Sequence, residues 1–232
     1  MIDEARKSAF DEPMRQAIAE LGEDFAGVFS IATIERFVGE SLGHFNRARV
    51  KAYVPLLVRR FAKERLKALA QSQGLAPKEV PEVLFVCVRN AGRSQMAAAL
   101  LARAADGRVH VRSAGSSPGN EIHRSVLQAL EEVGIDLFWE FPKPMSDEVV
   151  AAADVIITMG CGDACPIYGG KRYEDWNLPD PANETLEGVR ELRDDIGRRV
   201  RELLKRIVPP GPTPSLTLTS PPKKERGGGR RE

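Results

Sequence analysis

Apolar residues in the first third of the chain recur every three or four positions, a spacing that predicts amphipathic helices. Met14, Ile18 and Leu21 predict a first helix that ends near Gly22. Ser30 is expected to cap a second helix, and a third follows with a proline in its first turn or at a kink. The apolar positions of these two helices are Ile31, Ile34, Val38, Leu42, Phe45, Val50, Val54, Leu57, Val58, Phe61 and Leu69.

The pattern changes after residue 82, where short apolar runs alternate with helical stretches. Helices are predicted over residues 92–105, 123–134 and 184–208. Strands are predicted at VLFVC (83–87), HVRSAG (110–115), DVIITM (154–159) and KRYEDWNL (171–178). Alternating strands and helices form parallel sheets covered on both faces. The sequence therefore predicts an α/β protein with a three-layer, parallel four-stranded sheet, preceded by a small all-α three-helix bundle.

These patterns divide the chain into four parts. Residues 1–75 form the predicted bundle, residues 76–82 a proline-bearing linker, and residues 83–208 the predicted catalytic domain. Residues 209–232 contain few large apolar residues and many prolines, glycines and charges, which predicts a disordered tail. Three short helices bury little apolar surface, so we expect a homodimer through residues 1–75. The alternative is that these helices simply pack on the rest of the chain.

Composition excludes several broad classes of function. The chain has 232 residues and a net charge of +1, so no global field favours nucleic acid or a membrane surface as partner. Its apolar runs are too short to span a bilayer, and its charged N-terminus does not resemble a signal peptide, so we expect a cytoplasmic protein. In that compartment the three cysteines should be reduced, which makes each a candidate for catalysis, redox chemistry or metal binding.

The first cysteine stands where the strand 83–87 turns into a helix, in the sequence CVRNAGRS. Such a turn directs backbone N–H groups at one point, to which the helix N-terminus adds partial positive charge. We therefore expect an oxyanion cradle that stabilises the Cys87 thiolate as a nucleophile. Arg93 would bind an oxyanion through two N–H groups, and Ser94 would donate to the thiolate. The predicted oxyanion-binding residues are Val88, Arg89, Asn90, Ala91, Gly92, Arg93 and Ser94.

The other two cysteines, Cys161 and Cys165, follow the strand 154–159 in the sequence MGCGDACP. The carboxyl ends of parallel strands meet at one edge of a sheet, so both cysteines are expected near Cys87. Zinc needs four ligands, and the three histidines are scattered without ligand spacing, so no metal site is expected. A cysteine redox relay fits this arrangement better.

The sequence CVRNAGRSQMA resembles the active-site loop of the low-molecular-weight protein tyrosine phosphatase fold. Within that fold, the chain resembles the thioredoxin-coupled arsenate reductases over roughly residues 82–205. The stretches SAGSSP, GID, PMSDEVVAAADVIITMGCGDACP and DWNLPDPA carry this similarity. Residues 1–75 resemble the three-helix-bundle dimerisation domain that is fused to such reductases in some bacteria.

This resemblance implies a role for each candidate residue. Cys87 would attack arsenate, with Asp180 as the general acid for the leaving oxygen. Cys161 would then attack the adduct, arsenite would leave, and Cys165 would take over the disulfide. No bound cofactor is implied: the external reductant would be thioredoxin, or a small thiol with a glutaredoxin-like protein. The spacing between Cys161 and Cys165 is shorter than in the better-known relatives, which keeps the small-thiol route open.

Two other functions remain open on the sequence. A tyrosine phosphatase would use the same loop, but Gln95 and Ala182 stand where those enzymes usually have proline and an aromatic residue. Asp180 also has a simpler interpretation, because an aspartate before a proline is common in turns that have no catalytic role. A non-catalytic sensor could hold trivalent arsenic on three cysteines, although the helical part shows no obvious DNA-recognition helix. Arg89 differs from the usual residue in both families and would either strengthen the anion site or face solvent.

Overall fold

The computed structural model describes residues 11–45, 51–160, 167 and 169–208. Three helices come first: α2 (Glu12–Asp24), α3 (Ile31–His44) and, after the 3-10 turn η1 (Lys51–Tyr53), α4 (Val54–Ser72). The remaining elements follow in the order β1 (Glu82–Cys87), α5 (Arg93–Ala105), β2 (His110–Gly115), α6 (Arg124–Glu131), α7 (Asp147–Ala152), β3 (Val155–Met159), β4 (Arg172–Asp175), η3 (Pro181–Asn183) and α8 (Leu186–Ile207).

The four strands form one parallel sheet in the order β2-β1-β3-β4. β1 lies in the middle, and its last residue, Cys87, pairs with Gly115 of β2 and Met159 of β3. The three strands therefore end together beside the cysteine. This arrangement confirms the predicted fold class, and it places the start of the CVRNAGRS turn at the carboxyl edge of the sheet.

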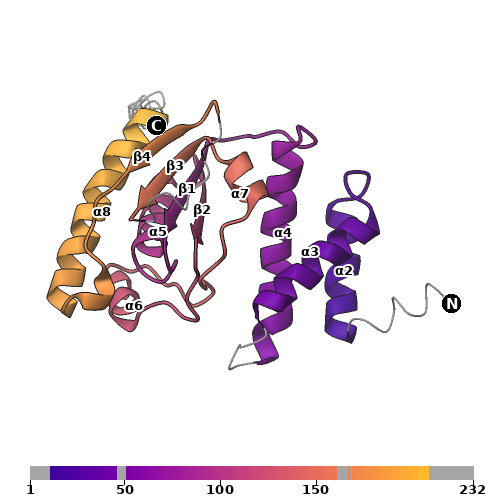
Figure 1. Cartoon of the computed structure of the whole chain (residues 1–232), viewed down its shortest axis with the longest axis horizontal. Coiled ribbons are helices and arrows are strands. Elements are labelled where there is room, and N and C mark those ends of the chain that lie inside the picture. The colour runs from indigo at the N-terminus through magenta and orange to yellow at the C-terminus, as the bar shows by residue number, and fades with distance from the viewer. Residues whose placement is uncertain (1–10, 46–50, 161–166, 168, 209–232) are drawn as a thin grey trace, which may run out of the picture.

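Both faces of the sheet are covered, which makes three layers (Figure 1). Val83 and Phe85 of β1 pack into a core shared with α5, α6 and α8. Leu84 and Val86 point to the opposite face and pack with α7 and with Ala68 of α4. Successive residues of a strand point to opposite faces, so an unbroken apolar run is what a strand buried on both sides requires.

Helices α2, α3 and α4 form a helical module with its own apolar core. Asp11 and Ser30 cap the first two helices by accepting hydrogen bonds from the N–H groups of Met14 and Thr33. Pro55 lies in the first turn of α4, where its missing N–H costs no helical hydrogen bond. The core residues are Met14, Ile18, Leu21, Phe25, Ile34, Phe37, Val38, Val58, Ala62 and Leu66.

Helix α4 belongs to both parts of the molecule. One side contributes to the core of the helical module, while the other covers the sheet beside α7 (Figure 1). Arg65 of α4 forms an ion pair of 2.6 Å with Glu148 of α7, and both side chains are largely buried. The helical module thus packs on the rest of the chain, which was the alternative to self-association in the sequence analysis. The homodimer stays a prediction.

The predicted elements are present, with ends that differ by a few residues. β1 begins at Glu82, one residue before the predicted strand, and α6 ends at Glu131 because the chain turns through Gly134 with φ of 74°. Helix α7 was not predicted, because six residues are too few to show a helical period. In the described part of the chain, no helix is both long enough and apolar enough to cross a membrane. The predicted tail lies outside the described residues.

Candidate active site

The residues 87–94, which we call the anion loop, are held from outside by the segment 115–123. The carbonyls of Cys87, Val88 and Arg89 accept hydrogen bonds of 3.2, 2.8 and 2.8 Å from the N–H groups of residues 116, 117 and 119. The carbonyl of Ala91 accepts one of 2.9 Å from the N–H of His123. In a trans peptide the next N–H points away from the carbonyl. The N–H groups of residues 88, 89, 90 and 92 therefore point into the loop, as an anion site requires.

Asn90 fixes the shape of the anion loop. Its φ is 47°, a left-handed conformation that asparagine adopts more readily than most residues. Its N–H donates to the Cys87 Sγ at 3.2 Å, which shows directly that this N–H faces the sulfur. The fully buried Asn90 side chain donates from Nδ2 to the Oγ of Ser94 at 2.8 Å.

The Oγ of Ser94 lies 2.9 Å from the Cys87 Sγ. The serine oxygen accepts from Asn90, which leaves its own hydrogen free to be donated to a Cys87 thiolate, since a thiolate can only accept. Cys87 is 2 % exposed, and its charged form would receive hydrogen bonds from both the loop backbone and Ser94. The arrangement suits a nucleophile that reacts as a thiolate.

Two glycines allow other segments to approach the loop. A Cβ at Gly92 would lie 2.4 Å from the Cγ of Pro181, so the turn that carries Asp180 can approach only a glycine here. A Cβ at Gly115 would lie 2.7 Å from the carbonyl oxygen of Val88. Gly92 has φ of −148°, so space rather than a left-handed backbone explains this glycine.

Arg93 is anchored at the mouth of the loop. Its Nη1 donates to the carbonyl of Leu178 at 3.2 Å, and its Nη2 lies 3.4 Å from an Oδ of Asp180. The other Oδ of Asp180 accepts from the N–H of Ala182 and caps η3. Asp180 therefore shapes a turn, as the simpler interpretation predicted, and also lies beside Arg93. The carboxyl is half-exposed, and its role as a general acid stays a prediction.

The remaining predicted loop residues differ in exposure. Ala91 is buried and Val88 half-buried, and both contribute through their backbone. The side chain of Arg89 is exposed and lies beside Gly119, whose N–H binds the Arg89 carbonyl. The side chain thus has access to solvent at the rim of the site.

Cys161 and Cys165 lie outside the described residues. The residue before them, Gly160, is described: its φ is 72°, and a Cβ there would lie 3.0 Å from Arg93 Nη1. The chain thus leaves β3 in contact with the anion loop. Met159, which pairs with Cys87, precedes Cys161 by two positions.

Two residues that support the loop were not predicted as part of the site. Gln95 Nε2 donates to the Asn90 Oδ1 at 3.0 Å, and the backbone N–H of Lys143 donates to the same oxygen at 2.8 Å. From the sequence, Gln95, which follows Ser94, was noted only because phosphatases usually have a proline at that position, and no supporting role was predicted for it. Lys143 is 53 residues from Asn90, and no sequence pattern connected them. Within the described ranges, no three His, Cys, Asp or Glu side chains meet as metal ligands would.

Two family models match the chain. Residues 82–209 match the low molecular weight phosphotyrosine protein phosphatase family, which covers more than half of the sequence. Residues 14–70 match a domain described as the N-terminal domain of protein-tyrosine-phosphatase-like proteins. The second match coincides with the helical module.

Similar proteins agree with these matches. A solved structure of the thioredoxin-dependent arsenate reductase of Corynebacterium glutamicum is 46% identical, covers 84% of this chain and 95% of that chain, and superposes with a TM-score of 0.74. A putative arsenate reductase of Halobacterium salinarum is 36% identical over 54% of this chain and 92% of its own length. A glutaredoxin arsenate reductase of Synechocystis is 34% identical over 54% of this chain and 98% of its own. The chain therefore belongs to the low molecular weight phosphotyrosine protein phosphatase family and groups with its arsenate reductases.

Proposed function

We propose that this chain reduces arsenate to arsenite with electrons supplied by thioredoxin. The observation that carries the proposal is the buried Cys87 sulfur, held by the Asn90 N–H and Ser94 inside a loop whose N–H groups face inward. That site suits a tetrahedral oxyanion attacked by a thiolate. The similarity to a thioredoxin-dependent arsenate reductase extends over 84% of the chain, well beyond the anion loop.

The first step is attack of the Cys87 thiolate on arsenic. The loop N–H groups and Arg93 hold the arsenate oxygens, and one arsenic–oxygen bond breaks as the sulfur–arsenic bond forms. Asp180 gives a proton to the departing oxygen, which leaves as water. Arsenic is still pentavalent at this point.

The second step transfers two electrons. The Cys161 thiolate attacks the Cys87 sulfur, the sulfur–arsenic bond breaks, and its electron pair stays on arsenic, which leaves as arsenite. Cys165 then attacks Cys161 and releases Cys87 as a thiolate, and thioredoxin reduces the Cys161–Cys165 disulfide. Such a cycle depends on reduced thiols, so we place the protein in the cytoplasm.

The fold supports the step between Cys87 and Cys161. Met159 pairs directly with Cys87, and two residues of chain span at most about 7 Å beyond it. Neighbouring strands lie about 5 Å apart, and a disulfide joins Cα atoms about 6 Å apart. The short stretch of sequence between Met159 and Cys161 is therefore compatible with the proposed Cys87–Cys161 disulfide.

The reductant and the reaction have one alternative each. A relative named for glutaredoxin is 34% identical, which favours a small thiol and redoxin as the second candidate for the electron source. Tyrosine phosphatase activity remains the second candidate for the reaction, because the family model describes phosphatases. The experiment below separates these candidates.

With NADPH, thioredoxin reductase and thioredoxin, we expect the full chain to oxidise NADPH only when arsenate is present, over many cycles. The Cys165→Ser variant should release about one arsenite per chain and then stop, since the disulfide stays at Cys87. Arsenite is quantified directly, with p-nitrophenyl phosphate as the phosphatase control.

Continuous turnover by Cys165→Ser would contradict the relay. If the wild-type chain turns over only with a small thiol and its redoxin, then that pair, and not thioredoxin, is the reductant. Phosphate release without arsenite formation would contradict the proposed reaction itself.

We also propose that the chain forms a homodimer through residues 1–75. The support is the match of residues 14–70 to a separate domain family and the small core of the helical module. Sedimentation velocity of the full chain, of 25.5 kDa, should show a species of twice that mass. A monomer at micromolar concentration would contradict the proposal.

A further inference from the structure

The anion loop and the helical module are connected through the segment 139–143, which crosses between them. The backbone of Lys143 is fixed at the end of β2, where its carbonyl accepts from the Gly115 N–H at 2.8 Å. From this position the Lys143 N–H reaches Asn90 at 2.8 Å. Gln95 Nε2 binds the Phe141 carbonyl at 2.9 Å as well as Asn90. The segment therefore supports the residue that sets the shape of the anion loop.

The helical module holds the opposite side of the same segment through an aromatic cluster. The ring of Phe141 lies 4.8 Å from that of Phe45 and 5.7 Å from that of Phe61, in edge-to-face contacts. The Nε2 of His44 lies 2.7 Å from the Pro142 carbonyl oxygen. A carbonyl can only accept, so the histidine nitrogen donates.

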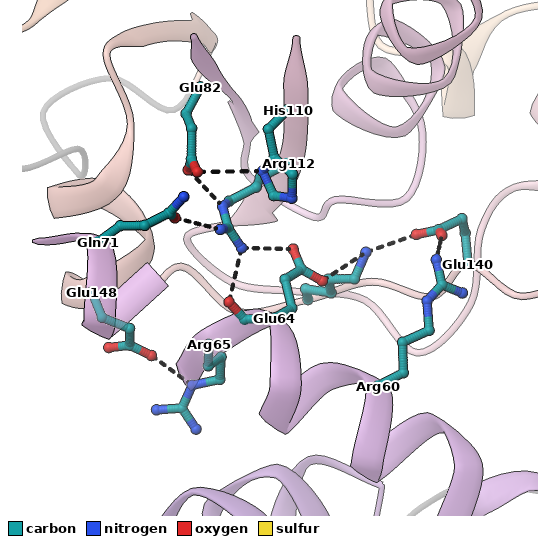
Figure 2. A network of polar contacts seen from close by, with 10 residues as sticks. Arg60, Glu64, Arg65, Gln71, Glu82, His110, Arg112, Glu140 and Glu148 are labelled. Carbon is teal, nitrogen blue, oxygen red and sulfur yellow. Dashed lines mark hydrogen bonds and ion pairs between the residues drawn. The ribbon is translucent and has the colours of Figure 1, made fainter. Parts of the chain in front are cut away.

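Charged groups of α4 add a second connection (Figure 2). Arg60 donates to the Trp139 carbonyl at 2.8 Å and pairs with Glu140. Glu140 in turn pairs with the buried Lys143 at 2.7 Å. Burial alone would raise the pKa of Glu140, but Lys143 and Arg60 together lower it, so the carboxylate stays ionised. These ion pairs are partly shielded from water, and ion pairs in such an environment are stronger than ion pairs on an open surface.

We infer that the helical module positions the anion loop, through His44 and Arg60 acting on the segment 139–143. The chain of contacts runs from these residues to Lys143 and Phe141, then to Asn90, Ser94 and the Cys87 sulfur. His44 and Arg60 are positioning residues, because neither touches the anion loop. The inference rests on the proposed function only in taking the loop as the oxyanion site.

The test measures the anion loop directly, without turnover. In full chains that carry Cys161→Ser and Cys165→Ser, iodoacetamide alkylates only Cys87, and inorganic phosphate protects it. We expect His44→Leu with Arg60→Ala to raise the half-protecting phosphate concentration about threefold to tenfold. His44→Gln, which keeps an N–H donor, should restore part of the protection in the presence of Arg60→Ala.

Arg59→Ala is the matched control, because Arg59 pairs with Glu20 and Asp24 inside the helical module. It should leave the phosphate protection unchanged, whatever its effect on the melting temperature. Unchanged protection in the His44 and Arg60 variants, or an equal loss in Arg59→Ala, would overturn the inference. A shift in phosphate protection together with no arsenate reduction by the wild-type chain would support the inference and overturn the proposed function.

Discussion

Cys87→Ser is expected to lower arsenate reduction by at least about 10⁴-fold, to the background of the assay. A serine hydroxyl is a weak nucleophile without a base beside it. The reduction also needs two sulfur atoms, because the electrons come from the conversion of two thiols into a disulfide. An oxygen at this position cannot form that disulfide, so even a slow attack on arsenate would give no arsenite.

The comparison of wild type with Cys87→Ser isolates the nucleophile, because serine is close in size to cysteine and Cys87 is 2 % exposed. The anion loop of the variant should keep its hydrogen bonds from Ser94 and Asn90, and phosphate binding measured by calorimetry should persist. Measured together, phosphate binding and arsenite formation separate loss of the nucleophile from loss of the site. Turnover near the wild-type rate in the serine variant would exclude Cys87 as the nucleophile.

The anion loop was predictable because its information is local. Cys87, Asn90, Arg93 and Ser94 lie within eight residues, and an apolar strand followed by a helix is enough to place them. The parallel sheet followed from unbroken apolar runs such as VLFVC. The placement of Cys161 and Cys165 at the same edge of the sheet rests on topology alone and stays a prediction, because both residues lie outside the described part of the chain.

The contacts between the helical module and the sheet could not be predicted, since periodicity shows which face is apolar but not what covers it. Arg112 illustrates the difference. In the strand HVRSAG an arginine suggests a position open to solvent, yet this side chain is 2 % exposed. Two of its partners come from α4, 41 and 48 residues away in the sequence. Lys143 and Asn90 are separated in the same way, and neither shows a pattern that would connect them.

Arg112 is the centre of a network of buried polar side chains between α4 and the sheet (Figure 2). It donates to the Glu82 carboxylate at 3.1 Å, to the Glu64 carbonyl at 2.9 Å and to the Gln71 side chain at 3.3 Å. His110 lies nearby, with its Nδ1 3.7 Å from the other Glu82 oxygen. Burial and the charge of Arg112 lower the pKa of His110 from 6.5 to about 4, so the ring is neutral at pH 7.

Arg112→Met is therefore expected to lower the free energy of unfolding by about 3–5 kcal/mol at pH 8, because it leaves the Glu82 carboxylate buried without its partner. Urea unfolding measures this loss, and Arg198→Met, at an exposed pair with Asp195, should change stability by less than about 0.5 kcal/mol. Adding Glu82→Gln should recover part of the loss, since it removes the unpaired charge.

The loss should also depend on pH. In the wild type the lowered pKa of His110 contributes stability that is present above pH 6.5 and is lost as the pH falls toward 4, because the unfolded chain binds the proton first. In Arg112→Met the repulsion from the guanidinium is gone, while burial and Glu82 remain. The pKa of His110 in the folded state should therefore lie above its wild-type value, and the ring should take up a proton at a higher pH. The difference between wild type and variant should therefore shrink between pH 8 and pH 5. A difference that stays constant over this range would show that the cost of the substitution comes from lost packing rather than from the buried charge.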